Sequence, residues 1–243
     1  MVAPTPGAGA ASAKREDRDG PLPWLLLVLT FVTGLVDAVS YLNLGHVFVA
    51  NMTGNVVFLG FAVVGVRDFS VSASLTALAA FLVGALAGGR LGSRTGQHRG
   101  RFLAIAVVVK ILLVAAALVL AMAVADPDSK FLRYALTVLL AVAMGVQNAA
   151  ARRLAVPDMT TTVLTLTLTG IAADSTLAGG SNPRPGRRLT AAVTMLMGAA
   201  VGAFLVLNVG VVAVLALTLT LLVLNGIASY RAATSSESWT VAA

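Results

Sequence analysis

The sequence predicts an all-α membrane protein, a polytopic bundle of transmembrane helices. Of its 243 residues, 58% are apolar and 11% are charged, whereas about a quarter of the residues in a soluble domain are charged. The apolar residues fall into eight segments, most of them long enough to cross a bilayer. The basic residues lie mostly in the short breaks between segments, as in the cytoplasmic loops of membrane proteins.

The charge balance is consistent with a lipid bilayer as the main partner. In a soluble protein a net charge of +7 would suggest nucleic acid. Here the positive-inside rule accounts for the basic residues, so we expect no nucleic-acid partner. The chain has no cysteine, which excludes a disulfide framework and a thiolate metal site.

The expected domain organisation is one membrane domain, residues 24–230, between two polar tails. Residues 1–23 are rich in Pro, Gly and Ala and carry several charges, so we expect a disordered cytoplasmic tail. The apolar run after Pro23 has no small-residue cleavage site and is predicted to be a retained first span. Residues 231–243 are predicted to be a polar C-terminal tail.

The placement of arginines decides how many of the eight segments cross the membrane. Eight crossings from a cytoplasmic N-terminus would put the arginines of residues 90–101 and 152–153 outside, against the positive-inside rule. If the second and sixth segments enter the membrane and return to the same side, both groups lie inside, together with both termini. We therefore predict six full spans plus two re-entrant half-helices in a multi-pass protein of the cell membrane. The segments are 24–44, 46–66, 70–91, 102–125, 131–151, 160–173, 189–207 and 209–228.

The two re-entrant segments share an anatomy. Each has a helical part, Val56–Val66 or Thr160–Ile171, that reaches about half-way across a bilayer. Each is preceded by a polar, non-helical stretch. Such backbone is tolerated at membrane depth only when it is buried in protein or lines a cavity.

An internal repeat relates the two halves, residues 24–125 and 131–228. Because each half holds three spans, the second is inverted relative to the first, which predicts the inverted 3+3 repeat of many transporters. The matched signals, in order, are Gly34-x-x-Asp37-Ala38 with Gly145-x-x-Asn148-Ala149, Asn51-Met52-Thr53 with Asp158-Met159-Thr160, and Gly84-x-x-x-Gly88 with Gly198-x-x-x-Gly202. The last pair favours close helix packing. It could serve within the chain or join copies in a homo-oligomer through the Gly84/Gly88 or Gly198/Gly202 face.

The stretch from Gly34 to Asn55 carries a family resemblance. Gly34-x-x-Asp37-Ala38 followed by Phe48-Val49-Ala50-Asn51-Met52-Thr53-Gly54-Asn55 resembles the YoaK-like family of predicted bacterial membrane proteins, over about residues 24–230. The resemblance implies a multi-span membrane protein of a family with no assigned function. It supplies no catalytic or binding residues.

The candidate site is built from polar side chains within the apolar spans. Asp37 lies roughly 20 Å into the first span by helical rise, where an acid is a functional hypothesis by default. Asn51, Thr53 and Asn55 are expected to cap the first half-helix and to contact a ligand. Lys110, inside another span, is expected to be a charge partner of Asp37. The second half contributes Asn148, Asp158, Thr160, Thr161 and Thr162.

We expect a gradient-driven transporter or channel for a small polar solute. There is no Gly-x-x-x-x-Gly-Lys-Ser/Thr for ATP, and no His-Glu-x-x-His or Gly-x-Ser-x-Gly for an intramembrane enzyme, so no enzyme, cofactor or metal is expected. The positive ends of two half-helices favour a small anion or zwitterion. The alternative is a non-transporting membrane protein that binds a lipid or a partner subunit.

Overall fold

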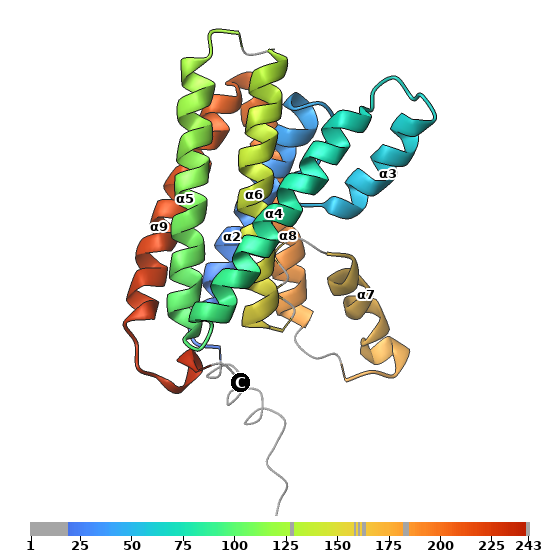
Figure 1. Ribbon diagram of the computed structural model, residues 1–243. Helices are drawn as coiled ribbons and strands as arrows, with labels where there is room; N and C mark the ends of the chain where they lie inside the picture. Colours follow the sequence, from blue (N-terminus) through green and yellow to red (C-terminus); the bar gives the residue numbers. More distant parts are fainter. Residues whose placement is uncertain are drawn as a thin grey trace, which may run out of the picture.

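The computed structural model describes residues 19–126, 129–157, 159, 161, 164–181 and 185–241. Most of the predicted N-terminal tail lies outside this part of the chain. The described residues form α-helices joined by short loops and two 3₁₀ turns (Figure 1). The elements are α2 (Leu22–Asn43), α3 (Met52–Val63), α4 (Val71–Thr95), α5 (Arg99–Ala123), α6 (Lys130–Leu154), α7 (Thr165–Ala173), η1 (Thr176–Ala178), α8 (Pro185–Asn208), α9 (Val211–Ala233) and η2 (Ser238–Thr240).

Six of the helices in the described residues, α2, α4, α5, α6, α8 and α9, are long and apolar enough to cross a membrane. The other two are half-length, with 12 residues in α3 and 9 in α7. The polytopic helical bundle and its count of six spans plus two half-helices are thereby confirmed. The chain is a multi-pass membrane protein.

Local sequence sets where the long helices begin and end. The side chains of Ser70, His98 and Ser129 accept backbone N–H groups of the first turns of α4, α5 and α6, at 3.3, 3.2 and 3.3 Å. Each satisfies a donor that the helix itself leaves without a partner. At the other end of α6, Ala155 adopts a left-handed conformation with φ of 49°, which stops the helix.

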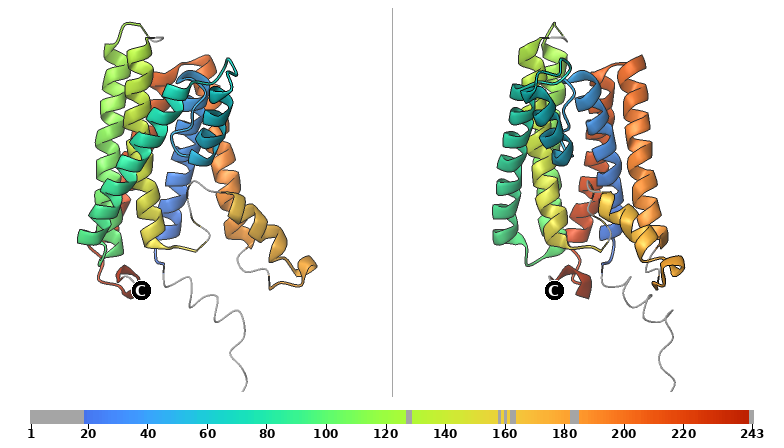
Figure 2. Two further views of the ribbon diagram at one scale, coloured as in Figure 1. Left: turned by 45° about the vertical axis from the view of Figure 1, so that its right-hand side comes forward. Right: turned by 90° about the vertical axis from the view of Figure 1, so that its right-hand side faces the viewer.

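The half-helices lie at opposite ends of the bundle. In all three views α3 occupies the upper half and α7 the lower half (Figures 1 and 2). The N-terminal end of each points towards mid-height, and its C-terminal end leads to the nearer end of the bundle. This is the arrangement that two re-entrant segments entering from opposite faces would have.

The helix contacts follow the internal repeat. Helices α4 and α5 of the first half pack on α6 of the second half, and α3 packs on α4. In the same way α8 and α9 of the second half pack on α2 of the first half, and α7 packs on α8. Every contact thus has a counterpart in which each helix is replaced by its repeat equivalent, as a pseudo-two-fold axis requires.

Glycines explain why these crossings are so close. A Cβ atom on Gly34 would lie within 3.0 Å of the backbone of Gly198, and one on Gly145 within about that distance of Gly84. The two sites are repeat equivalents, so the same backbone-to-backbone crossing is built twice. Small residues at a helix interface allow this approach in a membrane, where van der Waals packing drives association.

The glycine faces, expected to serve either within the chain or between copies, pack within the chain. Gly84 and Gly88 lie against α6, and Gly198 and Gly202 lie against α2. Both faces are covered within one chain because each helix uses its glycines to approach its neighbour. Self-association stays a prediction.

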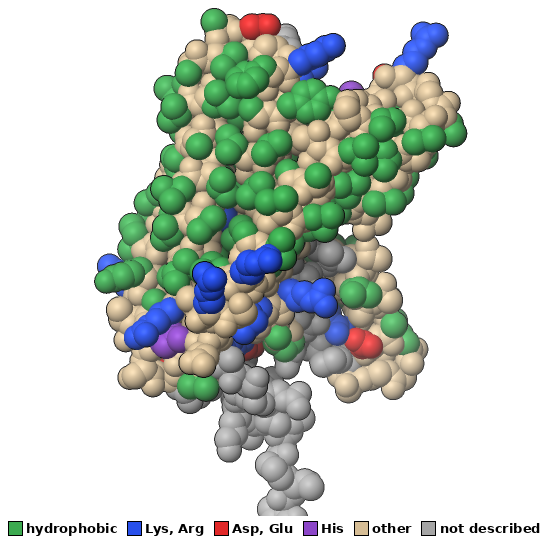
Figure 3. Space-filling view, viewed as in Figure 1, with side chains coloured by type: hydrophobic (Ala, Val, Ile, Leu, Met, Phe, Trp, Pro, Cys, Tyr) green, Lys and Arg blue, Asp and Glu red, His purple; other side chains and the backbone are tan. Residues whose placement is uncertain are grey.

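Both ends of the described chain meet at the arginine-rich end of the bundle, the lower end in Figure 3. Asp19 forms ion pairs with Arg99 at 3.1 Å and Arg187 at 3.6 Å. The C-terminal segment is less tail-like than its composition suggests, because α9 continues to Ala233 and Trp239 is only 4% exposed. The ring of Trp239 packs against Gly20, so the two ends close over the same face.

Candidate functional site

Asp37 anchors the loop that leads into α3. It lies in the buried face of α2, with 6% of its surface exposed. Its Oδ1 accepts the backbone N–H of Ala50 at 3.0 Å. A carboxylate held in this way fixes non-helical backbone at a depth where an unsatisfied N–H group would cost several kcal/mol. Asp37 therefore sets the position from which the first half-helix starts.

Asn55 closes the same loop with a pair of hydrogen bonds. It is fully buried, its Oδ1 accepts the N–H of Phe48 at 2.8 Å, and its Nδ2 donates to the carbonyl of Phe48 at 2.6 Å. The side-chain amide thus bonds the backbone N–H and C=O of Phe48, which in a helix or strand would bond other backbone groups. The polar atoms of Asn55 are used within the fold.

Aromatic rings fasten the re-entrant hairpin to the end of α2. Tyr41 stacks on Phe48 with ring centroids 5.2 Å apart, and Phe48 stacks on Phe58 of α3 at 5.6 Å. Phe58 in turn stacks on Phe69, just before α4, at 4.8 Å. Such offset pairs contribute stabilisation beyond that from burial of the rings. The stacked rings therefore tie the loop before α3, α3 itself and the loop after it to the end of α2.

Asn51 and Thr53 are exposed, and the expected capping of α3 is wrong. Asn51 occupies the N-cap position but makes no side-chain capping bond, and Asn55 bonds the loop instead of the helix. Asn51 ends the loop and Thr53 lies in the first turn of α3, and neither side chain makes a hydrogen bond with a described residue. The first turn of α3 thereby keeps backbone donors that no side chain among the described residues satisfies.

The second half repeats this site with different side chains. Asn148, the equivalent of Asp37, is half-buried and donates to the carbonyl of Met144 at 2.9 Å. Thr161 is 3% exposed, has a φ of 61°, and its hydroxyl has no hydrogen-bond partner among the described residues. The predicted site residues Asp158, Thr160 and Thr162 lie outside the described residues.

Lys110 bonds Gln147, and the expected contact with Asp37 is not formed. Its ammonium is buried in α5, with 1% of the residue exposed, and donates to Oε1 of Gln147 on α6. Gln147 donates in turn to the hydroxyl of Thr33 at 2.9 Å, one turn before Asp37 on α2. No ion pair links Lys110 with Asp37 in the described part of the chain, because Gln147 and Thr33 occupy the space between the helices.

This network was missed at the sequence level although a signal existed. Gln147 stands next to Asn148 in the second copy of the repeat motif, in an apolar span, and Thr33 precedes the first copy. Polar side chains within spans hydrogen-bond across helices. What the sequence lacks is the rotation of each helix, which decides that Gln147 faces Lys110 while Asn148 occupies the position of Asp37.

A comparison with known families identifies the family of the chain. The family model described as "Protein of unknown function (DUF1275)" matches residues 25–227. The chain belongs to this family. The match starts in α2 and ends in α9, so it covers all six spans and both half-helices.

A curated relative supports the same assignment. The chain is 35% identical over 151 residues to the UPF0700 transmembrane protein YoaK of Bacillus subtilis, a match that covers 62% of this chain and 65% of the relative. The match therefore spans a little less than two thirds of the relative. No solved structure is similar to the chain. The resemblance to a YoaK-like membrane family is thus confirmed, and the family carries no assigned activity.

Proposed function

We propose that this member of the family is a gradient-driven transporter or channel for a small polar solute, with its path at the break between α3 and α7. One observation carries the proposal. Two half-helices enter from opposite ends of the bundle and begin near its mid-height, where Asn51 and Thr53 remain exposed beside the loop that Asp37 anchors (Figure 1). Broken helices that meet in this way form the substrate sites of many transporters.

The cost of polar groups in lipid supports a water-filled path. An amide, a hydroxyl and unsatisfied backbone donors at the start of α3 would each lose hydrogen bonds if hydrocarbon covered them. Asp37 and Asn55 accept hydrogen bonds from backbone N–H groups of the loop. The side chains of Asn51 and Thr53 have no hydrogen-bond partner among the described residues. Water or a solute is the natural partner of these two side chains.

The charges near the break favour an anion or a zwitterion that binds through its carboxylate. Each half-helix N-terminus carries about half a positive charge. Lys110 adds a buried cation whose acceptor among the described residues is the neutral Gln147. Asp37 opposes these charges, but its carboxylate is engaged by the amide of Ala50. The sequence contains no ATP-binding motif, so an ion or solute gradient would supply the energy.

The proposal includes orientation in the cell membrane with both termini in the cytoplasm. The arginine-rich ends of α4, α6 and α9 and the arginine-rich starts of α5 and α8 lie at one end of the bundle. The positive-inside rule assigns that end to the cytoplasm.

The alternative, a protein that binds a lipid or a partner subunit without transport, has one observation in its favour. The short helix α3 packs on α4 and α7 packs on α8, while Val56, Phe61 and Leu166 on their surfaces are exposed. A partner could cover these faces. Copurification of a stoichiometric subunit, together with an absence of flux, would favour this alternative.

The test begins with purified protein and a panel of small metabolites in a thermal-shift assay. Solutes that stabilise the protein are then assayed for flux in proteoliposomes. We expect Asp37→Asn and Asn51→Ala to abolish flux, since both residues lie at the proposed path. Both variants should remain folded, because the amide oxygen that replaces the carboxylate of Asp37 can still accept the loop N–H and Asn51 supports no other described residue. The matched control is Asn208→Ala, an exposed asparagine at the end of α8, which should transport normally. Unchanged flux in both test variants would rule out the break as the path.

A further inference from the structure

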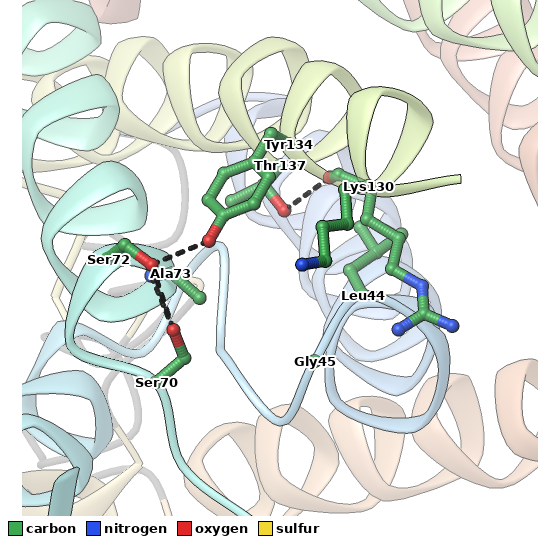
Figure 4. Close-up of a pocket in the computed structure, with 9 residues that line it drawn as sticks. Leu44, Gly45, Ser70, Ser72, Ala73, Lys130, Tyr134 and Thr137 are labelled. Atoms are coloured by element: carbon green, nitrogen blue, oxygen red, sulfur yellow. Dashed lines mark hydrogen bonds between the residues drawn. The ribbon is translucent and has the colours of Figure 1, made fainter. Parts of the chain in front are cut away.

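A cavity of about 280 Å³ lies at the end of the bundle opposite the arginine-rich end, and Figure 4 shows the residues that line it. Its walls come from the end of α2, the start of α4 and the first turns of α6. It continues into a second cavity of about 430 Å³, which shares Gly45, Ser70 and Arg133 with the first. We call the pair the outer cavity. Its size suits a small ligand, since pockets for drug-sized molecules start at about 300 Å³.

The outer cavity carries an excess of positive charge. Lys130 and Arg133 line the first part, and Arg67 and Arg133 line the second, where Asp68 is the one acidic residue among those that line it. The ammonium of Lys130 is directed into the opening and makes no ion pair with a described residue (Figure 4). The N-terminal ends of α4 and α6 both face this cavity and add their positive partial charges.

Hydroxyl groups on the opposite wall supply a neutral donor. Tyr134 Oη lies 2.7 Å from Ser72 Oγ, which lies 2.9 Å from Ser70 Oγ. Three hydroxyls carry three protons, and the two bonds within this chain use two of them. Whichever atoms donate in these two bonds, one O–H of the three hydroxyls is left to donate to a ligand.

We propose that the outer cavity binds a small oxyanion, a carboxylate or phosphate group held between Lys130, Arg133 and the hydroxyl chain of Ser70, Ser72 and Tyr134. Ammonium, guanidinium and hydroxyl are donors that match the several acceptor lone pairs of an oxyanion. The site lies apart from the break between α3 and α7, although the loop that starts at Leu44 on its wall is the one that Asp37 anchors. Binding here does not require that the chain transports a solute.

The test is isothermal titration calorimetry on the full chain in dodecyl maltoside at constant ionic strength. The probes are succinate, inorganic phosphate and, as a cation of similar size to succinate, putrescine. We expect heat from succinate or phosphate and none from putrescine. Lys130→Gln should weaken the binding about tenfold or more, as loss of a charge-assisted hydrogen bond does, and Tyr134→Phe should weaken it less. The control is Arg101→Gln, which removes one exposed positive charge at the other end and should bind as the wild type does.

A second arm identifies the source of the oxyanion. If succinate or phosphate still binds in phosphatidylcholine nanodiscs, the ligand is a soluble anion. If binding is seen in detergent and lost in nanodiscs, a phospholipid headgroup occupies the cavity. Equal affinity of the wild type and Lys130→Gln, preference for putrescine, or no binding of either anion in delipidated protein would overturn the proposal. Matching size-exclusion profiles of all variants exclude misfolding as the cause.

Discussion

Substitution of Gly84 by alanine tests how the bundle is held together. The new methyl group would lie against the backbone of Val142 on α6, closer than 3.0 Å, and backbone cannot rotate aside as a side chain can. The helices α4 and α6 would have to separate over their whole contact. Gly198→Ala would do the same to α8 and α2, because its methyl group would meet the backbone of Phe31.

The magnitude follows from overpacking. An extra methyl group forced into a closely packed interface costs about 1–3 kcal/mol. For a chain of this size that lowers the melting temperature by about 2–12 °C, on the scale of about 2–4 °C per kcal/mol. The matched control is Gly89→Ala, on the same helix, where the new methyl group meets no atom within 4 Å. It should leave the melting temperature unchanged or raise it slightly, since alanine is a better helix former than glycine.

The assay is thermal unfolding in detergent, followed by the fluorescence of a dye that reports exposed apolar surface. Gly84→Ala and Gly198→Ala should lower the melting temperature by similar amounts, because they disturb equivalent crossings of the repeat. A Gly84→Ala variant as stable as Gly89→Ala would refute the close backbone packing of α4 on α6. A large difference in melting temperature between Gly84→Ala and Gly198→Ala would show that the two crossings contribute unequally to stability.

Two further predictions concern the buried network and the topology. Gln147→Leu should destabilise the protein by about 1–3 kcal/mol or more, because it leaves the ammonium of Lys110 buried without an acceptor, and Lys110→Met in that background should restore most of the loss in the same thermal assay. An absence of rescue would contradict a direct pairing. In intact cells, cysteines at Gln97 and Gly186 should be shielded from an impermeant thiol reagent added outside, whereas one at Val66 should react; labelling of either shielded position would refute the proposed orientation.

The span count could be predicted because it depends on the hydropathy of whole segments and on the charges between them. The positions of arginine pairs such as Arg152-Arg153 exclude eight crossings irrespective of packing detail. The ends of the helices differ from the predicted segments by a few residues, since side-chain caps such as Ser70 decide them locally. Differences of five residues occur at the start of α7, which lies at Thr165 instead of residue 160, and at the end of α9, which lies at Ala233 instead of residue 228.

The repeat was also visible in the sequence, but its physical meaning was not. Matching Gly34 with Gly145, and Gly84 with Gly198, gave the relation between the halves. The structure adds that Gly34 packs on Gly198 and Gly145 on Gly84, which makes the glycines intramolecular contacts. A sequence cannot show whether a small-residue face meets its own chain or a second copy, because both arrangements favour the same residues.

The candidate site was predicted as a region and not as a set of contacts. Asp37 and Asn55 are buried where expected, but they hold the loop through Ala50 and Phe48. The partner of Lys110 depends on helix rotation, which hydrophobic periodicity does not fix in a span that is apolar on all sides. The outer cavity was missed because its walls come from the ends of three helices distant in sequence.

Reactivity of a single cysteine tests most directly whether water or solute reaches the break beside α3. The natural chain has no cysteine, so Asn51→Cys gives one labelling site. Its control is Leu82→Cys, 64% exposed in the middle of the span α4 and expected to face lipid. A charged methanethiosulfonate reacts with the thiolate, which forms only where water is present. In native membranes Asn51→Cys should be modified and Leu82→Cys should not. If Asn51→Cys reacts no faster than Leu82→Cys, the break faces lipid or packed protein, and the proposed path does not exist.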